Sequence, residues 1–107
     1  MEFRDTEGNR VVTIYVILDD NIRDAKKYEP YKAAVPKLVA RHGGEYLAHD
    51  GKFEVLVGDW KTHNIVIFRW PSREAWQAFL NDPDYQPWKT LRLAVAMTAN
   101  LMVVEGS

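Results

Sequence analysis

The chain has 107 residues, of which 47% are hydrophobic and 27% charged, a composition typical of one globular domain. Its 14 Lys and Arg residues nearly balance 15 Asp and Glu residues, which argues against the clustered basic surface that nucleic-acid binding requires. Cysteine is absent, which excludes disulfides, thiolate metal sites and a cysteine nucleophile.

Residues 1–10 are predicted to form a polar N-terminal extension, and residues 11–107 a single domain. The extension lacks the apolar core of a secretory signal. The longest apolar runs of the chain are far shorter than the roughly 20 residues that cross a bilayer. We therefore expect a cytoplasmic protein that does not bind membranes or nucleic acid.

The first element is a strand over residues 11–18, which we expect to stop at Asp19, Asp20 and Asn21. Its alternating positions are apolar on both sides, and residues 65–70 and 101–104 repeat this pattern. Strands that are apolar on both sides need both faces of their sheet covered.

A helix is predicted over residues 24–42, with Pro30 in its first turn and a kink at Pro36. Its apolar stripe recurs at helical spacing and comprises Tyr31, Val35, Leu38, Val39 and His42. Gly43 and Gly44 are expected to end the helix, because glycine accepts the positive φ angle of a helix C-terminus.

The stretch from residue 45 to 58 is predicted to be a β-hairpin, with Asp50 and Gly51 as its two-residue turn. Ser72 is expected to cap a second helix, and Asp82 followed by Pro83 to begin a third. One face of the third helix carries Tyr85, Trp88, Leu91, Arg92 and Val95.

This order of elements predicts an α+β fold, a ferredoxin-like βαββαβ subunit with an antiparallel sheet and helices on one face. The helices can cover only one side of such a sheet. We expect the open sheet face to pack on that of a second copy, giving a homodimer.

Four blocks of sequence carry a resemblance to a known family: "YEPYKAAVPKLVARHGGEYL", "EVLVGDW", "IVIFRWPSREAWQAFLNDPDYQPWKTLR" and "LMVVEG". In this order they resemble the family of small bacterial domains of unknown function numbered thirteen-thirty, over roughly residues 12–106. The resemblance implies a dimeric α+β barrel built from ferredoxin-like subunits, and it implies no activity. Residues at positions where the family has such residues are Tyr31, Gly43, Gly44, Gly58, Trp60, Phe68, Ser72, Tyr85 and Arg92. The chain departs from the pattern in its polar extension and in the loop "KTHN", which lacks an Arg often found before the third strand.

Arg92 is the most informative single residue, because it falls on the helix face that otherwise packs inward. One interpretation is an internal salt bridge, with Asp59 or Glu74 as a partner, or a contact with the second chain. The other is a guanidinium directed at a carboxylate or enolate oxygen of a ligand.

His42 is interpreted either as a packed histidine at a helix C-terminus or as a general acid or base in a cleft. His49 and His63 are expected to be solvated, and the spacing of the three histidines matches no metal motif. We predict no metal and no cofactor. Asp19 and Asp20 are interpreted as the start of a loop.

Three functional hypotheses remain open. The first is binding of a small organic acid or aromatic compound between helices and sheet, by Tyr31, His42, Trp60, Phe68, Tyr85, Trp88 and Arg92. The second is a cofactor-independent enzyme, similar to monooxygenases or isomerases of this architecture, with His42, Tyr85 and Arg92 as catalytic candidates. The third is a structural dimer without a ligand.

Overall fold

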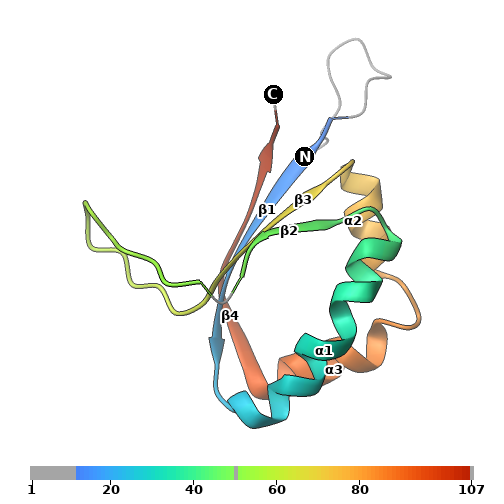
Figure 1. Cartoon of the computed structure of the whole chain (residues 1–107), viewed down its shortest axis with the longest axis horizontal. Helices are drawn as coiled ribbons and strands as arrows, with labels where there is room; N and C mark the ends of the chain where they lie inside the picture. The colour runs from blue at the N-terminus through green and yellow to red at the C-terminus, as the bar shows by residue number, and fades with distance from the viewer. Residues whose placement is uncertain (1–11, 50, 107) are drawn as a thin grey trace.

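The computed structural model describes residues 12–49 and 51–106 (Figure 1). Its elements in chain order are β1 Ile14–Ile22, α1 Ala25–Arg41, β2 Glu45–Ala48, β3 Ile65–Trp70, α2 Arg73–Leu80, α3 Gln86–Val95 and β4 Ala96–Glu105. The predicted extension over residues 1–10, the start of the first strand at Val11 and the turn residue Asp50 lie outside the described residues.

The strands form one four-stranded sheet in the order β2-β3-β1-β4, and all neighbouring strands are antiparallel. Figure 1 shows the three helices on one side of this sheet. The observed fold is therefore the predicted α+β ferredoxin-like subunit, with one face of the sheet free of helices. Across the described ranges, no helix has both the length and the apolar character needed to cross a bilayer.

The register of the strands separates an inner face, toward the helices, from an open face. Val16 lies opposite Phe68 and Val103 on the inner face, whereas Ile17 lies opposite Ile67 and Met102 on the open face. The core lies between the inner face and the helices; its buried residues are Ile14, Val16, Tyr28, Tyr31, Val35, Leu38, Val39, Trp70, Phe79, Tyr85 and Val95.

The first strand lies further along the chain than predicted: Val12 and Thr13 precede it, and Asp19, Asp20 and Asn21 continue it as far as Ile22. The interpretation of Asp19 and Asp20 as the start of a loop is wrong, since both side chains are buried within the sheet. Their carboxylates are satisfied there: Asp19 accepts hydrogen bonds from backbone N–H groups and Asp20 from side chains. Acidic residues are tolerated inside a strand when hydrogen bonds replace their lost hydration.

Helix α1 closely matches its predicted range, with Asp24 as its N-cap and His42 as its C-cap. The apolar stripe from Tyr31 to Val39 is buried as expected. The placement of Pro30 is wrong, because α1 begins at Ala25 and Pro30 lies beyond its first turn. Gly43 has a φ of +81° and turns the chain away from the helix, as the sequence indicated.

The predicted hairpin is not formed as expected. The strand β2 covers only its first part, and it pairs with β3 instead of with the residues after Gly51. Residues 51–64 form neither helix nor strand. We name residues 51–61 the arm, since every one of them is exposed and Figure 1 shows this segment projecting on the side of the sheet away from the helices.

The second predicted helix begins as expected, because the Ser72 side chain accepts a hydrogen bond from the N–H of Ala75 at 3.0 Å. The third begins later than expected, at Gln86, after a turn that starts at Asp82. Asp82 does not cap this helix, because its carboxylate accepts the N–H of Asp84 and the side chain of His42.

Candidate functional site

Two adjoining cavities lie between the helices and the inner face of the sheet. The first has a volume of about 80 Å³ and the second about 100 Å³. Residues that line both are Leu18, Tyr31, Tyr46, Phe68 and Arg92. The first cavity also contacts Tyr28 and Lys32 of α1, and the second reaches Tyr85 and Thr98. The two cavities together form a space with mostly apolar walls and a few polar groups.

Arg92 of α3 is fixed in place by Asp20 of β1. Its Nε donates to Asp20 Oδ2 at 3.2 Å, and its Nη2 donates to Asp20 Oδ1 at 2.8 Å and to Thr98 Oγ1 at 2.6 Å. Nη1 takes part in none of these bonds. Burial by itself lowers the pKa of Arg92, but hydrogen bonding and attraction to Asp20 outweigh it and raise the pKa, so the guanidinium stays charged. The predicted partners Asp59 and Glu74 are wrong, since the salt bridge is made with Asp20.

Tyr31 and Tyr85 meet beside this arginine, although they are 54 residues apart in the chain. Their hydroxyl oxygens lie 2.7 Å apart, so one of them donates to the other. Burial raises the pKa of Tyr31 and that of Tyr85. Both therefore remain neutral phenols near neutral pH, and the hydroxyl that accepts within the pair keeps its own hydrogen for another acceptor.

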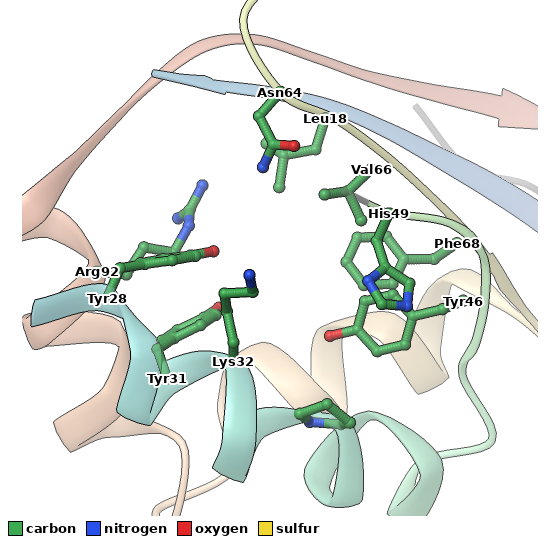
Figure 2. A pocket seen from close by; sticks show the side chains of 11 residues that line it. Leu18, Tyr28, Tyr31, Lys32, Tyr46, His49, Asn64, Val66, Phe68 and Arg92 are labelled. Atoms are coloured by element: carbon green, nitrogen blue, oxygen red, sulfur yellow. The ribbon is translucent and has the colours of Figure 1, made fainter. Parts of the chain in front are cut away.

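Figure 2 shows how the polar groups of the first cavity converge. The Arg92 guanidinium, the Lys32 amine and the Tyr31 hydroxyl point into the same space. Tyr46 presents its hydroxyl from the opposite wall, with the ring of His49 beside it at a centroid distance of 5.1 Å. The cavity thus combines positive charge with neutral hydroxyl groups and aromatic rings.

His42 lies away from both cavities. Its Nε2 lies 2.7 Å from Asp82 Oδ2, and its ring packs edge-on against Phe79 at 6.4 Å. Arg41 Nη1 donates to the same oxygen of Asp82 at 3.0 Å. These contacts connect the end of α1 to the turn before α3, so the observed geometry gives His42 a role in holding helices together.

The carboxylate of Asp82 should make the stability of the protein depend on pH in the acid range. The hydrogen bonds from His42 and from the N–H of Asp84 lower the pKa of Asp82 from 3.8 to about 2. A lowered carboxyl pKa stabilises the folded state above the unfolded-state pKa, and this contribution is lost as the pH falls from about 4 to about 2. Urea unfolding between pH 2 and pH 6 should show this loss in the wild type and a flatter profile in Asp82→Asn.

The matched control is Asp84→Asn, which removes an exposed carboxylate that contacts Arg41 but not His42. Most of the acid dependence should persist in this control. An Asp82→Asn profile as steep as the wild type would contradict the assignment of the acid dependence to Asp82.

Of the seven residues predicted for the site, the structure brings together four at the cavities: Tyr31, Phe68, Tyr85 and Arg92. It places the other three elsewhere. His42 is bound to Asp82, Trp60 is exposed on the arm, and Trp88 packs against the core as a half-buried side chain of α3.

Several cavity residues were not anticipated from the sequence. Asp20, which holds Arg92 at the cavity wall, was expected to lie in a loop, but it continues the alternation of Val16 and Leu18 along β1. Tyr28 precedes Tyr31 by one helical turn, which places the two on one side of α1, and their rings stack at 5.0 Å. The others, which carried no signal of their own, are Lys32, Tyr46, His49, Asn64 and Thr98. Among the residues described, no group of three or more His, Asp or Glu side chains is arranged to hold a metal ion.

Comparison with solved structures places the chain among ferredoxin-like proteins. It is similar to the methylated RPA0582 protein, with a TM-score of 0.75 and 20% identity over 94% of this chain and 85% of the other; a second structure of that protein gives its source as Rhodopseudomonas palustris. It is also similar to SnoaB, a cofactor-independent oxygenase from Streptomyces nogalater, with a TM-score of 0.61 and 15% identity over 90% and 94% of the two chains. A dimeric ferredoxin-like protein of unknown function from Thermobifida fusca gives a TM-score of 0.55 and 15% identity over 92% of each chain.

At these identities the similarity shows the fold alone. No curated protein sequence matches the chain. A match to a sequence family, in contrast, extends over nearly all of the chain, from residue 13 to residue 107. The chain therefore belongs to the family described as Domain of unknown function (DUF1330).

Proposed function

We propose that the protein binds a small organic acid or aromatic compound in the two cavities between its helices and its sheet. The observation that carries this proposal is the Arg92 guanidinium at the wall shared by both cavities, with Nε and Nη2 held by Asp20. An arginine fixed in this way is preorganised to hydrogen-bond an oxygen through Nη1.

The charge of the first cavity favours an anionic group on the ligand. Asp20 offsets the charge of Arg92, so Lys32 supplies the net positive charge of the lining. The Lys32 amine also lies 3.8 Å from the exposed carboxylate of Glu29, a contact of a type that stabilises little. A carboxylate near Lys32 and Arg92, with an aromatic ring against Phe68 and Leu18, would match both the charge and the apolar walls.

The two tyrosines define what the rest of the ligand is expected to offer. Because Tyr31 and Tyr85 remain neutral, both are poor bases, and the one whose hydroxyl accepts within the pair can donate its own hydrogen to a carbonyl or hydroxyl oxygen. Hydrogen bonding of a ligand to these tyrosines needs no proton transfer. A binding role therefore requires fewer functional side chains than a catalytic role does.

The proposal includes a homodimer formed through the open face of the sheet. Apolar side chains on this face remain solvent-accessible in the single chain, and Met102 and Val104 are exposed. A second sheet is a suitable cover, because it offers the same apolar surface under two-fold symmetry. The similar protein from Thermobifida fusca is described as dimeric.

An enzymatic role is the second candidate, and His49 is the observation that favours it. Its imidazole ring lines the first cavity beside Tyr46, where a bound compound would be within its reach. SnoaB, which is similar in fold, is a cofactor-independent oxygenase. Oxygen uptake with a phenolic compound that is lost in His49→Gln, while binding of that compound remains, would support this role over simple binding.

Ligand binding should be visible as a rise in melting temperature. Benzoate, 4-hydroxybenzoate and phenol are suitable probes, and a probe at 100 times its Kd stabilises the folded state by about 2.7 kcal/mol. We expect a rise of several degrees with the two carboxylates, and a smaller rise with benzoate in Lys32→Met, because that variant loses the charge.

The control is Lys27→Met. Lys27 lies on the same helix and forms the same type of contact, at 3.9 Å from Asp24, but it lines neither cavity. This variant should respond to benzoate as the wild type does. No rise with any probe in the wild type, or equal losses in both lysine variants, would contradict the proposed site.

A further inference from the structure

The arm, residues 51–61, is an exposed apolar segment that the single chain does not use. Every residue in it is exposed, and it contains no helix or strand. Leu56 and Val57, in the middle of the segment, are 80% and 88% exposed. The other large apolar side chains of the arm are Phe53, Val55 and Trp60. Several large apolar side chains exposed on one short segment indicate a place where another molecule binds.

We propose that the arm docks on a second copy of the chain. The first reason is position: the arm leaves the sheet on the side of the open face (Figure 1), and it follows Leu47 of β2, which is itself an exposed apolar side chain. The arm and the open face therefore border the same space, and one partner can contact both.

The second reason is area. At roughly 150–250 Å² for a fully exposed large side chain, the exposed fractions of the five apolar residues correspond to roughly 600 Å² per chain. In a two-fold dimer both arms contribute, so the arms alone supply roughly 1,200 Å², the lower limit for a stable interface of about 1,200–2,000 Å². The open face of the sheet adds to this area.

The third reason is charge. The charged residues of the arm are Lys52, Glu54, Asp59 and Lys61, two positive and two negative, so the arm has no net charge. A segment without net charge does not repel its own copy as a whole, whereas segments that bind anionic membranes carry an excess of Lys and Arg. A second copy thus fits the arm better than a membrane surface does.

Docking of the arm would also affect the ligand cavity, an inference that rests on the proposed binding function. His49 and Asn64 flank the arm, and both line the first cavity. Asn64 is in turn bound to β1, where its N–H donates to Asp19 and its carbonyl accepts the N–H of Asp20. An arm held by a partner therefore fixes one rim of the cavity, and assembly and ligand binding should strengthen each other.

The test is the double substitution Leu56→Asp and Val57→Asp, which changes exposed side chains and leaves the core intact. Light scattering of the purified protein at micromolar concentration should give the mass of a dimer for the wild type and of a monomer for the variant. We expect the dimer dissociation constant to rise at least tenfold, with an unchanged far-ultraviolet circular dichroism spectrum. The benzoate dissociation constant should rise at least threefold in the same variant.

The matched control is Leu93→Asp, an apolar side chain of α3 that is 63% exposed but lies on the helical layer. It should keep the wild-type mass and benzoate affinity. A double variant as dimeric as the wild type, or a monomeric wild type, would overturn the inference. So would a monomer that co-sediments with phosphatidylcholine vesicles through the arm. Failure of all probes to bind the wild type would count against the proposed function alone, because the mass measurement uses no ligand.

Discussion

Replacing Arg92 with alanine should lower the free energy of unfolding by about 3–5 kcal/mol, because the change leaves the carboxylate of Asp20 buried without its charged partner. The side chain of Asp20 is 1% exposed, and that of Arg92 is 15% exposed. Thr98 would still donate to Asp20, but a neutral hydroxyl cannot balance the charge. Urea unfolding of the two proteins at pH 7 would measure the difference.

The double variant Asp20→Asn with Arg92→Met removes the whole ion pair, whereas Arg92→Ala leaves the Asp20 carboxylate without its charged partner. It removes both charges, so it should be less destabilised than Arg92→Ala. Arg41→Ala is the comparison at the surface: Arg41 pairs with the carboxylates of Asp82 and Asp84, but it is half exposed, and its loss should have a much smaller effect. Equal effects of Arg92→Ala and Arg41→Ala would show that burial of the Arg92 pair has no energetic importance.

Replacing Gly44 with alanine should destabilise the protein by about 3 kcal/mol, the upper part of the range for inserting an atom into a packed core. A Cβ atom at Gly44 would lie 2.6 Å from Cζ3 of Trp70 and 2.7 Å from Cγ1 of Val39. Neither neighbour has room to move, because Trp70 is 0% exposed and Val39 is 1% exposed. Thermal unfolding followed by circular dichroism would show a melting temperature lower by roughly 10 °C or more.

The control for this prediction is Gly51→Ala in the arm, where an added Cβ meets no atom within 4 Å. Its stability should stay within about 0.5 kcal/mol of the wild type, as for most exposed substitutions. If Gly44→Ala were as stable as Gly51→Ala, the chain around β2 and Trp70 would have to pack more loosely than the structure describes.

Local patterns were sufficient to predict the fold. The helical stripe of α1, the glycine pair after it and the Ser72 cap each depend on residues a few positions apart, and each was placed correctly from the sequence. The errors arose where distant contacts overrule local preference. Asp50 and Gly51 favour a tight turn, but β2 obtains its hydrogen bonds from β3, and residues 51–61 form no strand.

The candidate site was only partly accessible to sequence reasoning. The helical position of Arg92 indicated that it faces inward, and the structure places it at the cavities. Its partner was missed because two adjacent aspartates are rare inside a strand, and only the folded chain shows that each one finds donors. No spacing rule connects Tyr31 with Tyr85, since their contact depends on how α1 packs against the turn that precedes α3.

The irregular pairing of β1 with β4 has a consequence for how the chain tolerates insertions and deletions. Asp19 lies opposite Asn100 and Asp20 opposite Thr98, so Ala99 is an extra residue on β4. Through this extra residue Thr98 comes to the same side as Asp20 and can bind Arg92; in a regular strand it would share the side of Asn100. The side chain of Ala99 takes part in none of these bonds. The extra residue nevertheless determines which face of the sheet the Thr98 side chain occupies. Deletion of this one alanine should therefore be harder to tolerate than its replacement by another amino acid.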